Sequence, residues 1–487
     1  MNYQAVIGLE VHAELQTKTK MFCGCPVVDS TKAAPNTAVC SVCSGLPGAL
    51  PVVNKKAVEY AIRVALALGC KIAHTSIFAR KNYFYPDLPK GYQISQYENP
   101  LAQFGVLSID TPLGTKDIHI TRIHMEEDAG KLTHVVDEKN GSYSLVDLNR
   151  AGVALLEIVS EPDLNSAEEA VAYAVALRDI VRELGVNSGD MEKGVIRFEA
   201  NVSLRLPGAE KLGTRVEIKN LNTFRGMEKA IRYEIARQTR LLDMGQSVIQ
   251  ETLGWNEDQE VTYSHRSKEE AHDYRYFPEP DLPPLVVEED WIEEIKSKLP
   301  ELPRARLQRI QRNYGLNLED ARLIASDEDT TRYFEEAVRV DPEITPKTIT
   351  NWIAGQILSW INSHSKSIRD IPVQPQELVN LLQTLQKEEI NQNTAKIILE
   401  EMLISGKPAN QIIAEKGYQQ VSDATTINGL VAQVLQENPK PMADYLAGKE
   451  TLIHWFFGQV MRAAQGQANP QVLREELEKQ LRAKKRD

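Results

Sequence analysis

The stretch Arg122-Ile-His-Met-Glu-Glu-Asp-Ala-Gly-Lys131 places three consecutive carboxylates directly after the β-branched run of residues 118–123. Like charges packed this closely repel one another unless water or a cation separates them. Taken alone, three acidic residues are typical of a solvated turn. A functional role becomes the better interpretation if other segments bring polar groups to the same place. Three segments of the chain have a pattern that would do so.

Each of these three segments alternates polar and apolar residues with the period of two that is typical of a half-buried strand. The polar positions are Glu10, His12 and Glu14 in residues 8–15, Arg197, Glu199, Asn201, Ser203 and Arg205 in residues 197–205, and Arg215, Glu217 and Lys219 in residues 214–219. We expect these strands to lie side by side, so that their polar faces form one concave surface rich in oxygen atoms. Such a surface suits a hard divalent cation, with Arg and Lys near enough to bind phosphate.

The length of 487 residues predicts two or three domains. No apolar run approaches the roughly 20 residues that a membrane span needs, and charged residues lie where a signal peptide would have its apolar core, so we expect a cytoplasmic protein without a membrane partner. The formal charge of −12 argues against a chain coated for nucleic acid. However, residues 406–487 hold 11 Lys+Arg and 9 Asp+Glu, a net charge of +2 that leaves −14 for the rest.

Four of the five cysteines form two close pairs, Cys23-x-Cys25 and Cys40-x-x-Cys43, with 14 residues between the pairs. In a cytoplasmic chain this spacing indicates a four-thiolate zinc site rather than disulfides, although two such pairs can also arise by chance. Four thiolates would close the coordination sphere, so the zinc would be structural. We expect the fifth cysteine, Cys70, to pack in the core at the end of a helix.

Residues 80–97, rich in aromatic, proline and basic residues, are predicted to be irregular and exposed, and residues 264–284 form another polar, aromatic and proline-rich stretch. The rings of the first segment would stack on an adenine or on an unpaired RNA end, or would only pack a loop onto the domain. The second segment offers basic side chains that would bind phosphate or lie in a solvated loop, namely His265, Arg266, Lys268, His272 and Arg275.

Helices are predicted near residues 165–184, capped by Asn165 and Ser166, and near 225–244, each ended by a glycine. From Trp291 onward the apolar period is helical almost throughout, so an α+β domain is followed by an all-α region. Gly406-Lys-Pro408 is predicted to begin a smaller helical tail.

The common phosphate-loop, dinucleotide and hydrolase-nucleophile motifs are absent, so ATP would need another kind of site.

Six long motifs, in residues 8–15, 80–96, 124–131, 147–163, 213–225 and 267–284, resemble the GatB/GatE family of glutamyl/aspartyl-tRNA amidotransferase subunits, and the match covers nearly the whole chain. The resemblance implies a cradle domain at 1–292, an antiparallel sheet flanked by helices, with a zinc-binding insertion at 20–45. It further implies a helical domain at 293–405 and a YqeY-like tail at 406–487, which would meet the elbow of the tRNA.

The same resemblance implies a heterotrimer with an amidase-type A subunit and a small C subunit. The amidase would release ammonia from glutamine, and this chain would use ATP and Mg²⁺ to phosphorylate the side-chain carboxylate of a Glu or Asp misloaded on tRNA. Ammonia would then displace the phosphate to give Gln-tRNA or Asn-tRNA. Phosphorylation is needed because a carboxylate oxygen is a poor leaving group. The sequence does not discriminate between the two misacylated tRNAs.

By resemblance, the metal-binding positions are His12, Glu127 and Glu217, with Glu10 and Glu199 as second-site partners. Catalytic roles are expected for Glu10, His12, Glu127 and Lys219, and phosphate contacts for Arg197, Arg205 and Lys219. Two functions of other classes would use the same acidic face. One is a two-metal phosphoesterase or nuclease, and the other is a non-catalytic tRNA-binding adaptor with an inert ion site.

Overall fold

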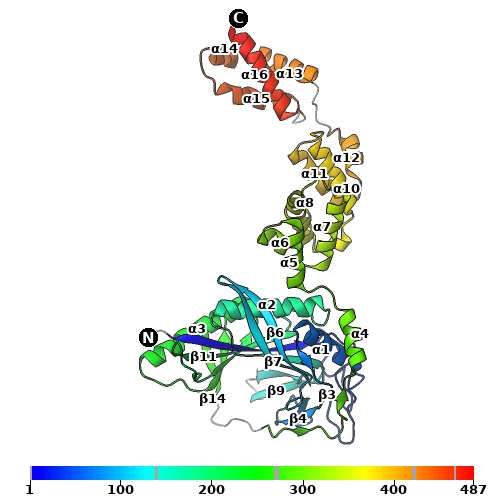
Figure 1. The fold of residues 1–487 in the computed structure, drawn as a ribbon, viewed down its shortest axis with the longest axis vertical. Coiled ribbons are helices and arrows are strands. Elements are labelled where there is room, and N and C mark those ends of the chain that lie inside the picture. Colours follow the sequence, from blue (N-terminus) through cyan, green and yellow to red (C-terminus); the bar gives the residue numbers. More distant parts are fainter. Residues whose placement is uncertain (1–2, 138–140, 268–273, 419–423, 465–467, 487) are drawn as a thin grey trace. The chain divides into compact units, whose positions relative to one another are not determined.

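The computed structural model describes residues 3–137, 141–267, 274–418, 424–464 and 468–486. The chain divides into two compact units, residues 1–302 and 303–487. The first unit is built on a sheet, and the described residues of the second unit form helices (Figure 1). The predicted α+β class, with an all-α region after the sheet domain, is confirmed.

The centre of the first unit is a nine-stranded sheet. Its strands are β1 (Gln4–Glu14), β2 (Lys71–Ile72), β6 (Ala102–Thr111), β7 (Gly114–Glu127), β10 (Ala154–Ser160), β11 (Ile196–Arg205), β12 (Val216–Leu221), β13 (Glu251–Asn256) and β14 (Val261–Ser267). They lie in the order β14-β13-β12-β11-β1-β10-β7-β6-β2. All neighbours are antiparallel except β12 and β13. The long helix between these two strands supplies the crossover that a parallel pair requires.

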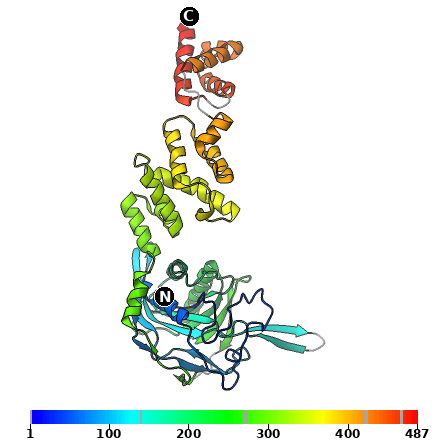
Figure 2. The ribbon, with the colours of Figure 1, turned by 90° about the vertical axis from the view of Figure 1, so that its right-hand side faces the viewer.

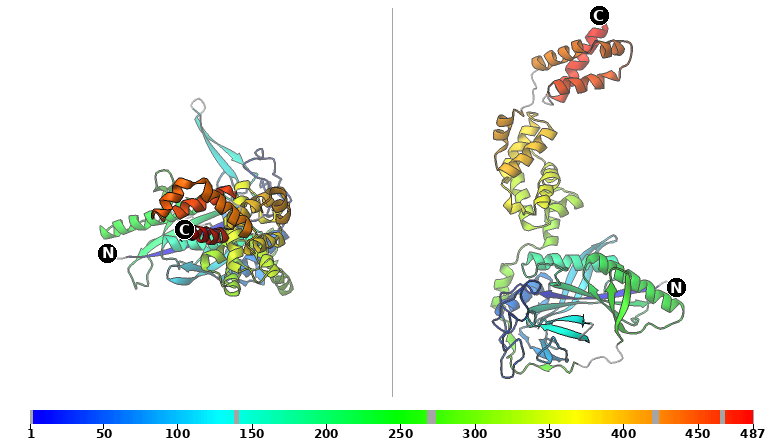
Figure 3. Two further views of the ribbon diagram at one scale, coloured as in Figure 1. Left: turned by 90° about the horizontal axis from the view of Figure 1, so that it is seen from above. Right: turned by 180° about the vertical axis from the view of Figure 1, so that it is seen from behind.

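Helices pack on the apolar side of this sheet. They are α1 (Lys55–Ala67), α2 (Ala167–Glu183) and α3 (Phe224–Asp243), and α4 (Glu289–Ser297) packs against α1. Leu9 and Val11 of β1 are at most 1% exposed and share one core with α1, α2 and α3, and Figure 3 shows α2 lying along the sheet. Ser166 caps α2 by accepting a hydrogen bond from the backbone nitrogen of Glu169, as predicted. Gly185 and Gly245 follow α2 and α3 with the positive φ that glycine tolerates.

Three small sheets complete the unit. They are formed by β15 (Phe277–Pro278), β4 (Ala79–Asn82) and β5 (Tyr92–Ser95), by β16 (Leu285–Val286) and β3 (Thr75–Ser76), and by β8 (Lys131–Asp137) and β9 (Gly141–Asp147). Figure 2 shows the β8–β9 hairpin projecting from the unit. The prediction that residues 80–97 are wholly irregular is wrong, because β4 and β5 pair with each other. Pro86 and Pro89 lie between these strands, where no ladder hydrogen bond is lost.

The second unit contains α5 (Pro303–Tyr314), α6 (Leu318–Ile324), α7 (Glu328–Val340), α8 (Pro346–Trp352), η1 (Ile353–Ile357), α9 (Leu358–His364), η2 (Ile368–Asp370), α10 (Pro375–Gln386), α11 (Gln392–Ser405), α12 (Ala409–Lys416), α13 (Ala424–Glu437), α14 (Pro439–Leu446), α15 (Leu452–Ala463) and α16 (Pro470–Arg486). Buried side chains from Ile310 to Ile413 form one core, and those from Ile427 to Leu481 form another. The domain borders at 292 and 405 stay predictions. Across the described ranges, no helix combines the length and apolar character that crossing a membrane requires.

Candidate active site

Strand register brings histidine and carboxylate side chains together on the polar face of the large sheet. His12 of β1 is opposite Glu157 of β10, and Glu157 is opposite His124 of β7. On the other side of β1, Glu10 is opposite Glu199 of β11. Side chains that are directly opposite in neighbouring strands share one face. The predicted side-by-side arrangement of β1, β11 and β12 is confirmed, with β10 inserted between β1 and β7.

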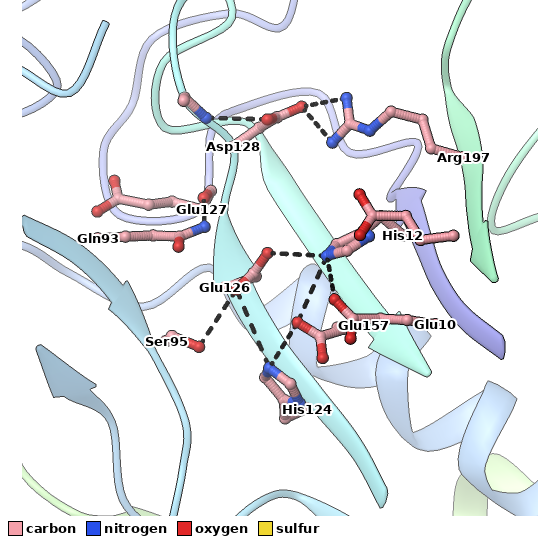
Figure 4. Close-up of polar contacts among 12 residues, drawn as sticks. Glu10, His12, Gln93, Ser95, His124, Glu126, Glu127, Asp128, Glu157 and Arg197 are labelled. Atoms are coloured by element: carbon pink, nitrogen blue, oxygen red, sulfur yellow. Dashed lines mark hydrogen bonds and ion pairs between the residues drawn. The ribbon is translucent and has the colours of Figure 1, made fainter. Parts of the chain in front are cut away.

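Glu157 lies between two histidines of the cluster (Figure 4). Its Oε2 lies 3.4 Å from His12 Nε2 and 3.3 Å from His124 Nε2. His12 Nε2 also lies 3.7 Å from Glu126 Oε1 and 3.7 Å from Glu10 Oε1. Ligand atoms of Glu10, His12 and Glu157 lie within 4.8 Å of one another, as do those of His124, Glu126 and Glu157. Such spacing lets oxygen and imidazole ligands share a divalent cation.

Burial and mutual repulsion shift the proton affinity of these groups. Burial, helped by the charge of Glu157, raises the pKa of Glu10 to about 7. Burial opposes protonation of His12, but the hydrogen bond to Glu157 and the charge of Glu126 outweigh it and raise the pKa of His12 to about 9. Burial also opposes ionisation of Glu157, yet His124 and His12 hold the pKa of this carboxyl well below its usual range. The cluster therefore holds protons that a cation would displace.

A lysine lies beside this cluster and is held by two carboxylates. Lys219 Nζ is 2.9 Å from Glu199 Oε2 and 3.8 Å from Glu217 Oε1. Thr252 Oγ1 donates a hydrogen bond to Glu217 Oε2 at 2.7 Å. Glu199 and Glu217, both predicted metal ligands, thus bind an ammonium group here. Neither belongs to any of the three cation-sized groups of ligand atoms found among the described residues.

The two predicted phosphate-binding arginines have different surroundings. Both terminal nitrogens of Arg197 lie 3.0 Å from Asp128 Oδ2, at the edge of the cluster. Burial opposes ionisation of Asp128, but Arg197 lowers its pKa. Arg205 Nε donates to Gln4 Oε1 at 3.1 Å. Arg205 stands six residues beyond Glu199 on β11, about 20 Å at the rise of a strand, so the fold does not bring it to the cluster.

Glu127 points away from His12, because successive side chains of β7 alternate between faces (Figure 4). Lys90 Nζ donates to both of its carboxylate oxygens, at 2.5 and 2.6 Å, and the backbone nitrogen of Ile94 donates at 2.9 Å. Glu127 is 2% exposed. Of the five predicted magnesium ligands, Glu10 and His12 are therefore the two that converge with other ligand atoms.

Three residues of the cluster, Glu126, His124 and Glu157, were not predicted as site residues, although the sequence contains a pattern that indicates each of them. Glu157 is the one charged residue in the apolar strand Ala154–Ser160, and an isolated buried carboxylate is costly unless it has a partner. Extending the period of two along residues 118–127 would have put His124 and Glu126 on one face.

The four cysteines predicted to hold zinc converge. Sulfur atoms of Cys23, Cys25, Cys40 and Cys43 all lie within 4.8 Å of one another. Cys43 Sγ is 3.9 Å from Sγ of both Cys25 and Cys40, and a hydrogen bond from Cys23 lowers the pKa of Cys43 to about 4. Four sulfur donors fit tetrahedral zinc with no open position for substrate. Cys70 is 8% exposed and packs in the core, as predicted.

The two tyrosine-rich segments meet. Tyr97 and Tyr276 stack with their centroids 4.2 Å apart, and Tyr83 and Tyr274 make an edge contact. These contacts favour the interpretation that the rings pack one segment on the other, although Phe84 remains 82% exposed. The predicted phosphate contacts of Lys268 and His272 lie outside the described residues, and so do the side chains of His265 and Arg266; Arg275 is exposed.

The fold and the site define an α+β domain whose sheet presents a face rich in carboxylate and imidazole groups, followed by a helical region. A family model described as the GatB/GatE catalytic domain matches residues 5–293, and one described as a GatB domain matches residues 332–481. The chain is 51% identical to the B subunit of aspartyl/glutamyl-tRNA(Asn/Gln) amidotransferase from Thermodesulfovibrio yellowstonii over 98% of each chain. It is 50% identical to the corresponding B subunit from Geotalea daltonii over 99% of this chain and 100% of the relative. The chain belongs to the GatB/GatE family of amidotransferase subunits.

Binding of a divalent cation to the cluster should release protons. At pH 7 His12, with a pKa of about 9, is protonated and Glu10, with a pKa of about 7, is half protonated, whereas ligands must be deprotonated. We expect the affinity for Mn²⁺ to rise between about pH 6 and pH 9, and the calorimetric heat to depend on the ionisation enthalpy of the buffer. An affinity independent of pH and a heat independent of buffer would contradict this.

Glu127→Gln should destabilise the protein, because it leaves the ammonium of Lys90 largely buried without its anionic partner. We expect a loss of about 3–5 kcal/mol in the free energy of unfolding, measured by urea denaturation. Glu210→Gln is the matched control, since Glu210 lies exposed in a loop, and it should change stability by less than about 0.5 kcal/mol. Equal stabilities of the two variants would show that the Lys90–Glu127 pair contributes little.

Proposed function

We propose that this chain acts as the B-type subunit of a glutamine-hydrolysing amidotransferase that converts Glu-tRNA(Gln), Asp-tRNA(Asn) or both into the amidated aminoacyl-tRNA. Two lines support the proposal. The relatives so named match the chain over nearly its whole length. The convergence of Glu10, His12 and Glu157 on the polar face of the sheet is the structural observation that carries it, because phosphoryl transfer depends mainly on cations that position and neutralise phosphate.

The reaction would have two steps. A side-chain carboxylate oxygen of the misloaded Glu or Asp attacks the γ-phosphorus of ATP, ADP leaves, and an acyl phosphate forms. Ammonia then attacks the carbonyl carbon, phosphate leaves with the electron pair of the C–O bond, and the amide results after loss of a proton. A bound Mg²⁺ would supply charge neutralisation of the phosphate oxygens and a template for in-line transfer.

Within this proposal, Glu10, His12 and Glu157 bind the cation, and His124 and Glu126 hold Glu157 and His12 in place. Lys219 would offer its positive charge to a phosphate oxygen. Glu199 and Glu217, which contact the ammonium of Lys219 here, would then be free to bind a second cation. Arg197 sits at the cluster edge with the same capacity as Lys219 to contact phosphate. Glu127 would act only after exchanging Lys90 for another cation.

Three further features belong to the proposal. Ammonia would come from glutamine hydrolysed by an amidase A subunit, and a small C subunit would complete a heterotrimer. The names of the relatives agree with a multi-subunit enzyme, since each denotes one subunit of an amidotransferase. ATP and Mg²⁺ would be required at the cluster. The four cysteines would hold one structural zinc, which stabilises the segment between β1 and α1 where regular structure is sparse.

Glu10→Gln tests the proposed site with the least risk to the fold. The raised pKa of Glu10 means that its carboxylate destabilises the folded protein as the pH rises from the usual glutamate range through about 7. A neutral amide removes that penalty, so at pH 8 the unfolding temperature should not fall, whereas ATP cleavage dependent on misacylated tRNA should be lost by at least about 100-fold. Glu210→Gln should leave both properties unchanged.

The assay uses the assembled protein with its partner subunits, ATP, Mg²⁺, misacylated tRNA and ammonium as nitrogen donor. Near-normal amidation by Glu10→Gln would place the chemistry elsewhere. Cleavage of the RNA would favour the phosphoesterase alternative, and neither reaction in the unsubstituted protein would favour the adaptor. Glutamine hydrolysis should survive in Glu10→Gln, because it belongs to the partner amidase.

The helical tail should contribute affinity for tRNA. Residues 406–487 carry a net charge of +2, while the rest carries −14, so an RNA backbone would meet less repulsion there. Deleting residues 406–487 should raise the KM for aminoacyl-tRNA and flatten its salt dependence, since phosphate contacts weaken steeply with salt. Initial rates give the KM, and filter binding gives the Kd and its salt dependence, for full-length and truncated assemblies across a salt series. Identical affinities and slopes would remove the tail from tRNA recognition.

A further inference from the structure

Lys20 is a buried lysine whose ammonium group lies against a sulfur atom. Its side chain is among the largest that have no exposed surface. Burial of an ammonium group costs several kcal/mol unless opposite charge and hydrogen bonds compensate it. Among the residues that the structure describes, no Asp or Glu forms an ion pair with Lys20. Its Nζ instead donates to the Sγ of Cys43 at 3.6 Å and to the carbonyl oxygen of Leu148 at 3.2 Å.

The main chain of Lys20 is bound to the other cysteine pair. Its backbone nitrogen donates to the carbonyl oxygen of Cys25 at 3.0 Å. Its carbonyl oxygen accepts a hydrogen bond from Asn54 Nδ2 at 3.2 Å. Lys20 therefore joins the two halves of the cysteine cluster, with its backbone on Cys25 and its ammonium on Cys43.

Gly152 covers the stem of this lysine. A Cβ atom at Gly152 would lie 3.3 Å from Cys43 Cβ and 3.5 Å from Lys20 Cδ, and the residue has a φ of +85°. The backbone nitrogen of Met21 donates to the carbonyl oxygen of Gly152 at 2.8 Å. Because only a glycine readily adopts this φ, the backbone of the turn approaches the aliphatic stem closely, and the side chain of Lys20 has no exposed surface.

Four thiolates around a divalent metal carry a net charge of −2, and one ammonium reduces it to −1. We propose that Lys20 is a positioning residue of the cysteine site, which donates a hydrogen bond to the Cys43 thiolate, offsets part of the negative charge and thereby sets the metal affinity. This inference rests on the zinc site proposed above and adds a residue outside the four ligands. Partners of this kind orient ligands and tune the bound metal.

Lys20→Met tests the inference, with Lys18→Met as the matched control. Lys18 lies two residues earlier and is exposed, so the same substitution there leaves the cysteines untouched. Competition with a chromophoric zinc chelator gives the Kd of each full-length protein. We expect Lys20→Met to raise the Kd for zinc by about 10–100-fold, and Lys18→Met to leave it unchanged.

A second measurement separates metal tuning from simple packing. The unfolding temperature of each protein is recorded with and without zinc, and the gain on adding zinc at a fixed concentration should be smaller in Lys20→Met. A lysine that only packs would lower the stability of both forms equally and leave the Kd unchanged. That result overturns the inference.

Lys20→Gln covers the case in which Lys20→Met does not fold. The amide keeps a hydrogen-bond donor and fills much of the volume, but it carries no charge, so the Kd of this variant for zinc should also rise. If the Kd of Lys20→Gln for zinc equals that of the unsubstituted protein, the proposed role of Lys20 is overturned while the zinc site stands. Failure of the unsubstituted protein to bind zinc overturns the zinc site as well, so the two failures are distinguishable.

Discussion

Glu157 lies between His12 and His124, and this pairing across three adjacent strands determines where the rest of the site can be. A shift of one residue in either ladder would send Glu157 to the helix-covered side of the sheet and separate it from both imidazoles. The register is secured by the apolar half of the same strands, whose Leu9, Val11 and their neighbours are buried. The packing of the apolar face therefore fixes the register, and the register places the histidine and carboxylate side chains on the opposite face.

Clustering several buried carboxylates on one face of the sheet is electrostatically unfavourable. Glu10, Glu126 and Glu157 surround one imidazole in a mostly buried setting, and the pKa of Glu10 rises to about 7 as a result. Groups placed against their own electrostatic preference are typical of functional sites. Two buried carboxylates beside the cluster are paired with cations, Glu127 with Lys90 and Asp128 with Arg197, and this pairing offsets part of the cost of burying them.

Local patterns predicted much of this protein, and long-range pairing explains what they missed. The period of two predicted the polar faces of β1, β11 and β12, helix caps predicted the ends of α2 and α3, and cysteine spacing predicted the convergence of four sulfurs. The position of β10 between β1 and β7 results from pairing between residues some 145 apart, such as His12 and Glu157, and no local pattern contains it. Lys90 reaches Glu127 from the loop between β4 and β5, and no local pattern contains this contact either.

We propose that Glu10, His12 and Glu157, placed by register, form the cation site used for phosphoryl transfer. A crystal of the protein soaked with Mn²⁺ in place of Mg²⁺ tests this most directly, through the anomalous scattering of the metal. We expect a peak whose nearest protein ligand atoms are those of Glu10, His12 and Glu157, within about 2.5 Å. A peak beside Glu127 and Lys90, with none at Glu157, would contradict it.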